Sequence, residues 1–198
     1  MATEHGPTLL ALARGALAQA LYRTSPVPTL PAGALWLHEL GATFVTLTQR
    51  GQLRGCIGTL EPHRPLHADV QANAVAAALR DPRFAPLAIH ELAHTAIEVS
   101  LLSGREPLSF GSEAEALALL RPGTDGVVLA CGQRRSTFLP QVWEQLSEPA
   151  EFLAQLKAKA GLPRDFWSSQ MQLERYTVRK WKEAGPGAGA AGTREEQV

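Results

Sequence analysis

The sequence is poor in cysteine, in net charge and in long apolar runs, and each shortage excludes a class of protein. Two cysteines in 198 residues are too few for a disulfide-stabilised secreted scaffold, so a reducing compartment is expected. The formal net charge is +0, which argues against nucleic acid as the main partner because phosphate binding requires a basic stripe. No apolar run reaches the roughly 18 residues of a membrane span, and the N-terminus lacks the basic start of a signal peptide. We therefore expect a cytoplasmic protein that binds neither nucleic acid nor a membrane.

Hydrophobic residues make up 45% of the chain, and their spacing alternates between that of helices and that of strands. The elements follow no regular β–α–β rhythm, so we expect an α+β fold with a mixed, largely antiparallel sheet and flanking helices. One domain is expected over residues 1–183, with an extended proline-rich connector over 23–33 and a disordered tail over 184–198. Helices are expected over 7–22, from 65 to the Asp81–Pro82 step, over 112–121 with Ser112 as the cap, and on both sides of Pro149 within 140–161; strands are expected over 42–60 (two, joined at Arg50–Gly51), 95–103, 122–140 (two) and 171–181.

The stretch QLRGCIGTL, residues 52–60, carries the most unusual combination of residues in the chain. If it forms a strand, alternation places Arg54, Cys56 and Gly58 on one face. A guanidinium near the sulfur favours the nucleophilic thiolate, Gly58 would leave open space beside it, and Gly55 would permit a close backbone approach. The face would then form the floor of a small pocket for an anionic ligand. The alternative is that Cys56 is a small buried residue, as free cysteines often are.

Five segments, in order, resemble a single protein family: LRGCIGTL, NAVAAALRDPRF, IEVSLLS, PGTDGVVL and TFLPQVW. Over about residues 7–182 the chain is similar to the AMME chromosomal region protein family, whose bacterial members are called AmmeMemoRadiSam system protein A. The resemblance implies an α+β domain in which a larger and a smaller lobe face each other across a cleft. It also implies a genomic association with a Memo-like protein and a radical SAM protein, and an enzymatic or regulatory role.

The residues that match the family's motifs are the candidate site residues. Gln141 stands where the family has a glutamate, so the charge of that position is lost. Glu98, in the middle of an expected strand, would be solvated or paired with Arg54 or Arg83, as a structural ion pair as readily as a catalytic one. Cys56 is the catalytic candidate, and the candidates for substrate or partner binding are Arg54, Gly55, Gly58, Thr59, Asp81, Arg83 and Glu98. The other matched residues are Ile57, Phe84, Ser100, Pro140, Gln141 and Val142.

The pentapeptide HELAH, from His90 to His94, matches the H-E-x-x-H pattern of zinc proteases, in which Glu91 would be the general base. The segment between Pro86 and the strand expected from Thr95 holds barely two helical turns, and no histidine follows His94 as a third ligand. We therefore expect a short surface helix and neither a metal nor another cofactor.

Two hypotheses about function follow from these residues. In the first, the chain is part of an enzyme, with Cys56 as a reactive thiolate, Arg54 holding an anionic group and His63 as a candidate base. In the second, the same motif lines a groove of a non-catalytic adaptor that binds a Memo-like or radical SAM protein. Cys131 lies in an apolar strand and is expected in the core.

Overall fold

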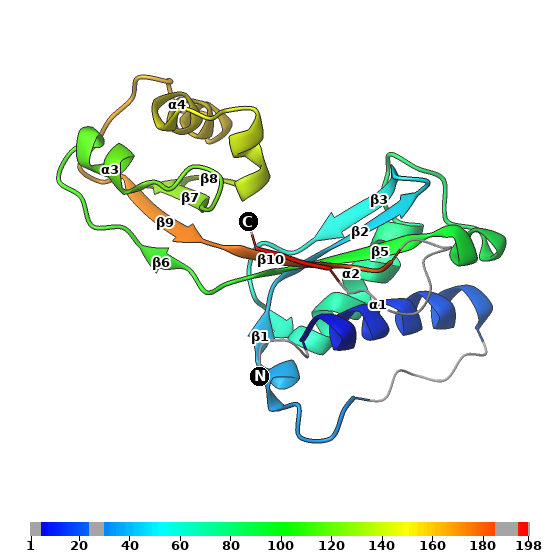
Figure 1. Cartoon of the computed structure of the whole chain (residues 1–198). Helices are drawn as coiled ribbons and strands as arrows, with labels where there is room; N and C mark the ends of the chain where they lie inside the picture. Colours follow the sequence, from blue (N-terminus) through cyan, green and yellow to red (C-terminus); the bar gives the residue numbers. More distant parts are fainter. Residues whose placement is uncertain (1–4, 24–29, 185–193, 198) are drawn as a thin grey trace. The chain divides into compact units, whose positions relative to one another are not determined.

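The computed structural model describes residues 5–23, 30–184 and 194–197, which divide into two compact units. The first unit comprises the described residues of Met1–Leu102 and Arg179–Gln197, and the second comprises Ser103–Val178. Each unit combines helices with antiparallel strand pairs (Figure 1), so the predicted α+β class is confirmed. The cleft between two lobes stays a prediction.

The first unit is built on a five-stranded sheet of order β11-β10-β5-β2-β3. The β2–β3, β2–β5 and β10–β11 pairs are antiparallel, and a separate small ladder joins β1 to β4. The elements of this unit are α1 (His5–Tyr22), the 3₁₀-helix η2 (Leu35–His38), β1 (Leu40–Gly41), β2 (Thr43–Gln49), β3 (Gln52–Gly58), β4 (Arg64–Pro65), α2 (Leu66–Leu79), the 3₁₀-helix η3 (Ile89–His94), β5 (Ala96–Leu102), β10 (Val178–Lys182) and β11 (Arg194–Gln197).

The core of the first unit lies between one face of this sheet and the helices α1 and α2, which both cover that face (Figure 1). Alternation along the strands directs Val45 and Leu47 of β2, and Ile97 and Val99 of β5, into this layer, where all four are fully buried. Burying each such side chain stabilises the fold by about 1.5–3 kcal/mol. The alternate residues of the same strands therefore face away from the helices.

The second unit has a four-stranded sheet of order β6-β9-β7-β8 and its own hydrophobic core. Trp143 stacks on Phe152 with ring centroids 3.7 Å apart, and its indole N–H donates to the carbonyl of Asp125 at 2.7 Å. This unit consists of β6 (Glu106–Pro107), α3 (Glu113–Leu119), β7 (Gly126–Cys131), β8 (Arg134–Phe138), the 3₁₀-helix η4 (Pro140–Glu144), α4 (Pro149–Lys159) and β9 (Gln172–Tyr176).

The expected elements are largely present, with two differences. The segment before Pro149 forms only η4, because Pro149 starts α4 rather than interrupting a longer helix. The strand expected over 171–181 is split at Thr177 into β9 and β10, which belong to different sheets. Ser112 caps α3 as expected, since its hydroxyl accepts the backbone N–H of Glu115.

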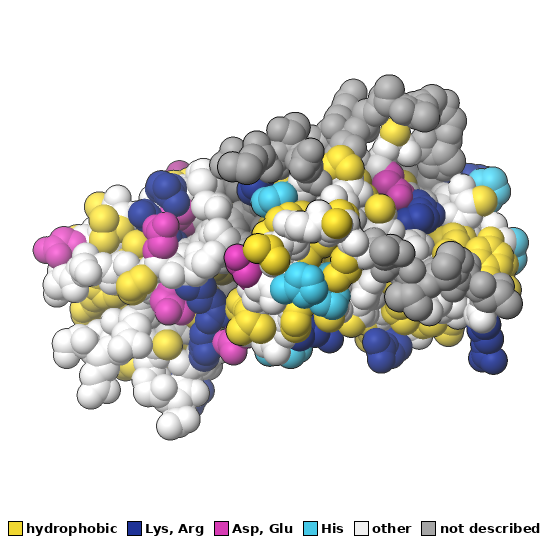
Figure 2. All heavy atoms as spheres, turned by 90° about the horizontal axis from the view of Figure 1, so that it is seen from below, with side chains coloured by type: hydrophobic (Ala, Val, Ile, Leu, Met, Phe, Trp, Pro, Cys, Tyr) yellow, Lys and Arg dark blue, Asp and Glu magenta, His cyan; other side chains and the backbone are white. Residues whose placement is uncertain are grey.

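The ends and the connector are described only in part. Within the range expected to be disordered, Arg194–Gln197 forms β11 on the edge of the first sheet, while 185–193 and 198 lie outside the described residues. Residues 24–29 of the expected connector also lie outside them. None of the helices within 5–23, 30–184 and 194–197 is long and apolar enough to cross a membrane. On the face shown in Figure 2, Lys and Arg side chains are scattered among hydrophobic and acidic ones.

Candidate functional site

The LRGC segment lies in a hairpin whose register shifts at one point. The strands β2 and β3 are joined by Arg50–Gly51, whose φ values of 50° and 78° fit the type I′ turn that two-residue hairpins favour. Opposite the Leu47–Thr48 step the register shifts by one residue, and Arg54 is the extra residue of this β-bulge. The alternation that placed Arg54 on the face of Cys56 is therefore broken, and that prediction is wrong.

The two glycines around the thiol have different surroundings. A methyl group on Gly55 would overlap the carbonyl oxygen of Ala77 in α2, so this glycine allows the close backbone approach that was expected. A methyl group on Gly58 would overlap the ring of Phe44, its cross-strand partner. The open space predicted beside the sulfur at Gly58 is therefore filled by an aromatic ring.

The Cys56 side chain faces away from α1 and α2, in a polar row that crosses three strands. Thr46 lies opposite Cys56 on one side and opposite Glu98 on the other. Its hydroxyl donates to the half-buried sulfur at 3.3 Å. Opposed residues bring their Cβ atoms to within about 4.5–5.5 Å, so a thiol, a hydroxyl and a carboxylate share one strip of the sheet. Of the two environments expected for Glu98, pairing with Arg54 or Arg83 is not found, because each of these arginines is bound to another carboxylate.

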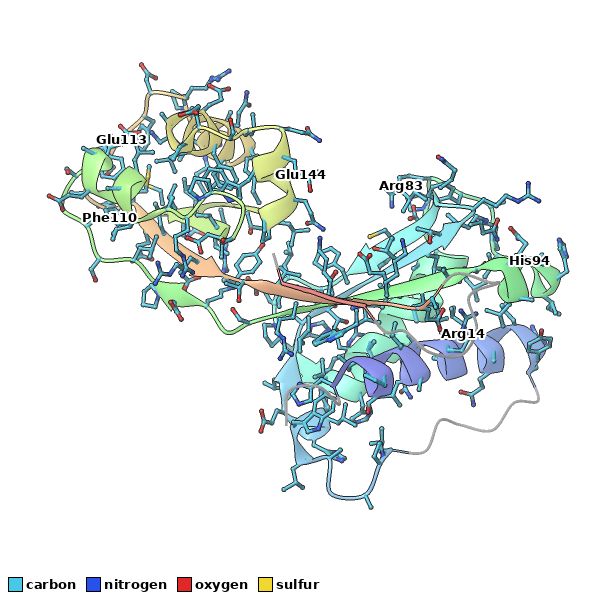
Figure 3. All side chains as sticks on the ribbon, in the orientation of Figure 1. Arg14, Arg83, His94, Phe110, Glu113 and Glu144 are labelled. Atoms are coloured by element: carbon cyan, nitrogen blue, oxygen red, sulfur yellow. The ribbon has the colours of Figure 1, made fainter. Side chains whose placement is uncertain are left out.

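The DPRF segment is attached to this strand by a buried carboxylate. Asp81 accepts the backbone N–H of Cys56 at 2.8 Å, and Arg83 returns a hydrogen bond to the Cys56 carbonyl at 3.2 Å. Arg83 also donates to both oxygens of Asp81, at 2.9 and 2.7 Å, and Figure 3 shows it beside β3. The hydrogen bonds from Arg83, with the Cys56 N–H, hold the pKa of Asp81 well below its usual range despite its burial. Asp81 and Arg83 thus bind both the backbone N–H and the carbonyl of Cys56, and we call these contacts the Asp81–Arg83 clasp.

Arg54 instead forms an ion pair with Glu91, the central residue of HELAH. Its Nε and Nη2 donate to the two carboxylate oxygens at 3.0 and 3.1 Å, and its Nη1 donates to the carbonyl of Ala85 at 3.0 Å. Glu91 also accepts from Gln49 at 3.1 Å and from the backbone N–H of Ala88 at 2.8 Å. These donors lower the pKa of Glu91 to about 2, and the hydrogen bonds from Arg54 have the largest effect. At neutral pH Glu91 is therefore charged and fully hydrogen-bonded.

This pairing excludes the zinc-protease interpretation of HELAH. The segment forms η3, a 3₁₀-helix of six residues, and Glu91 is an ion-pair partner rather than a base awaiting a metal-bound water. His90 and His94 are exposed, and Figure 3 shows His94 at the outer end of this element. Among residues 5–23, 30–184 and 194–197, no three His, Cys, Asp or Glu side chains are grouped as metal ligands.

A hollow of about 860 Å³ opens between the end of the β2–β3 hairpin and η3. It is lined by residues 48–54 of the hairpin, by Ala96 and Lys182 of the sheet, and by His90, Glu91 and His94. Across the strands, Leu53, Thr48 and Ala96 form a row, and the row of Cys56 is the next one along the sheet. Successive rows on one face are roughly 6–7 Å apart, so the thiol adjoins the hollow without lining it.

Arg14 fixes the η3 side of the hollow to the helical layer. Its guanidinium donates to the carbonyls of Leu92 at 3.0 Å and Thr95 at 2.7 Å, and it pairs with Glu183. Arg14 itself is labelled on α1 in Figure 3. The η3 wall of the hollow is therefore fixed at two points: Arg14 binds its backbone carbonyls, and Arg54 binds the Glu91 side chain.

Thr59 belongs to a separate buried network rather than to the hollow. Its hydroxyl donates to Asp69, a fully buried carboxylate that also accepts from Thr43, Arg64 and Asn73. Because every acceptor position of Asp69 is occupied, this network specifies the packing of α2 on the sheet. Thr59 has a structural role here.

Other matched residues lie at buried or half-buried positions or in the second unit, away from the hollow. Ile57 lies against the first core, Ser100 is buried on β5 opposite Phe44, and the Pro140–Val142 segment forms part of η4 in the second unit. Sequence reasoning missed Thr46, Gln49, Ala88 and Asp69, and assigned Glu91 only as a base. Nothing in the sequence indicated the Arg54–Glu91 pair, because Glu91 lies 37 residues from Arg54 and this spacing does not predict a contact.

The comparisons with known proteins agree on one family. Residues 10–181 match the family model AMMECR1. A protein of Methanothermobacter thermautotrophicus is 37% identical over 188 residues, covering 93% of this chain and 97% of the relative. A protein of Thermotoga maritima is 40% identical over 150 residues, covering 75% and 80%. The crystal structure of the uncharacterized protein PH0010 from Pyrococcus horikoshii matches with a TM-score of 0.79 at 30% identity, covering 98% of this chain and 97% of that one.

Proposed function

The chain belongs to the AMMECR1 family. Because its LRGC segment resembles a motif of that family, we propose that this strand builds a binding site rather than a catalytic centre. The ligand is a small polar molecule that enters the hollow between the hairpin end and η3. The observation that carries this proposal is the hollow itself, whose volume of about 860 Å³ lies within the range of about 300–1,000 Å³ typical of small-molecule sites.

The rigidity of the polar groups in the hollow supports a binding role. The Arg54 guanidinium is fixed at three of its nitrogen atoms, and its partner Glu91 is fixed by the hairpin and by its own element. Donors held in place before a ligand arrives lose little conformational entropy when it binds, which favours affinity. A general base, by contrast, needs a pKa near the working pH, and the pKa of Glu91 is about 2.

A ligand screen against isotope-labelled protein tests this proposal. Fragments of neutral, cationic and anionic classes are titrated while the backbone amide shifts of residues 48–54 and 90–96 are followed. At least one fragment is expected to shift these amides, and Gln52→Trp, which places an indole at the mouth of the hollow, is expected to abolish the effect. The matched control is Gln133→Trp, an exposed turn residue of the second unit. Unchanged amides throughout the screen, or binding that survives Gln52→Trp, would refute the proposal.

A second candidate is thiol chemistry at Cys56, as part of an enzyme. It is favoured by the hydrogen bond from Thr46 to the sulfur and by the Glu98 carboxylate in the same row, next to the hollow. A ligand in the hollow would then lie about one row of side chains from the thiol. Cys56→Ser separates the two candidates, because it removes an enzymatic activity but leaves ligand binding intact.

The family resemblance, rather than any contact, carries the proposal of protein partners. We propose that the chain acts alongside a Memo-like protein and a radical SAM protein. Co-purification of the three proteins with and without a ligand from the screen is the measurement. Absence of a complex in both conditions would refute the partnership while leaving the ligand site untouched.

A further inference from the structure

The charges of the hollow carry an inference about the class of its ligand, which rests on the proposed function. We infer that the hollow takes a small anion that presents carboxylate or phosphate oxygens. Its lining contains three permanent cations, Arg50, Arg54 and Lys182, and a single carboxylate, Glu91. The excess is therefore two positive charges, and His90 and His94 add ring nitrogens that can donate to an anion.

The carboxylate of Glu91 does not oppose an anion as a free carboxylate would. Four N–H groups occupy its oxygens: two from Arg54, one from Gln49 and one from Ala88. Because these donors neutralise it in place, it offers no acceptor to a cationic ligand. The same contacts hold the guanidinium plane of Arg54 in one orientation.

The donors that remain are suited to an oxyanion. Arg54 uses one N–H on each of its three nitrogens, so one N–H on Nη1 and one on Nη2 have no partner among the residues that the structure describes. Arg50, at the exposed hairpin turn, and Lys182, at the exposed end of β10, likewise form no ion pair there. A guanidinium held in one orientation, together with two exposed cations that form no ion pair among the described residues, is suited to binding carboxylate and phosphate groups.

Titration with inorganic phosphate and with malonate at low ionic strength tests this inference and separates the two kinds of oxyanion. Both are expected to shift the amides of residues 48–54 and 90–96, with saturation in about the millimolar range. Arg50→Gln and Lys182→Gln are each expected to weaken binding about two- to fivefold, and together about tenfold, because exposed charge pairs are individually weak. The matched control, Arg80→Gln, removes an exposed arginine that lines a separate hollow against α1, and binding should stay within about twofold of wild type.

The outcomes are distinct. If phosphate and malonate leave these amides unshifted, or if the double variant binds them as tightly as wild type, the inference is overturned. If a neutral or cationic fragment occupies the hollow and the anions do not, the anionic class is wrong while the proposed binding function stands. If malonate alone binds, the ligand is a carboxylate; if phosphate alone binds, it is a phosphate compound.

Discussion

Replacing Glu91 by glutamine removes one charge and leaves the shape of the side chain almost unchanged. In the folded protein the pKa of Glu91 is about 2, against about 4.3 for an ordinary glutamate, so the charged form is stabilised by about 3 kcal/mol before screening. Water reaches 22% of this side chain, so we reduce the expected contribution to about 1–2 kcal/mol. Glu91→Gln should therefore lower the free energy of unfolding at neutral pH by about that amount, since Arg54 loses its counter-charge.

The pH dependence gives the sharper test. A lowered pKa stabilises the fold above the ordinary pKa of about 4.3, and this stabilisation is lost as the pH falls from there towards 2. The difference in the free energy of unfolding between wild type and Glu91→Gln should therefore shrink across that window. It is measured by urea unfolding with a probe in the first unit. The matched control is Glu98→Gln, which removes a carboxylate without an ion pair in the described structure and should change stability by less than about 0.5 kcal/mol. An equal loss for both variants, or a loss from Glu91→Gln that does not depend on pH, would refute the reasoning.

Three further predictions concern the strand itself. Asp81→Asn should destabilise the fold by about 2–3 kcal/mol in urea unfolding, because the buried clasp loses its charge and gains a donor where only acceptors fit; wild-type stability would contradict the clasp. Gly55→Ala should cost about 1–3 kcal/mol or more, because the added methyl overlaps a carbonyl of α2, whereas Gly104→Ala, with open space around it, should be neutral in the same assay. Alkylation of the folded protein at neutral pH, followed by mass spectrometry, should modify Cys56 within about a factor of ten of the rate of Cys131, since both are half-buried. A hundredfold faster reaction at Cys56, about 2.7 kcal/mol in barrier, would favour the enzymatic candidate instead.

The residues around the thiol now separate into two groups. Asp81, Arg83 and Gly55 hold the strand in place, through the clasp and the close contact with α2. Arg54 faces the hollow, and Cys56 lies on the next row of the sheet. Changes in the first group should lower stability, whereas a change at Cys56 should leave both stability and ligand binding largely intact; Arg54 contributes to stability through Glu91 and to the proposed ligand site.

The sequence by itself determined the local features, because these depend on neighbours along the chain. The spacing and type of the apolar residues predicted the two strands within 42–60 and the strand over 95–103, and the Arg50–Gly51 step predicted the hairpin turn. The cap at Ser112 and the close approach at Gly55 were also readable, since each depends on one residue type with a specific conformational property. The α+β class followed from the order of these elements.

Only the tertiary structure decided what the motif residues contact. The bulge at Arg54 arises from how β3 pairs with β2, and a shift of one residue moves a side chain to the other face. Phe44 covers Gly58, and Glu91 binds Arg54, through pairings between segments that are distant in sequence. Such contacts depend on the relative placement of whole elements, which neither composition nor periodicity encodes. The sequence therefore predicted the strand, and the packing around it determined that Arg54 binds Glu91 while Cys56 contacts Thr46.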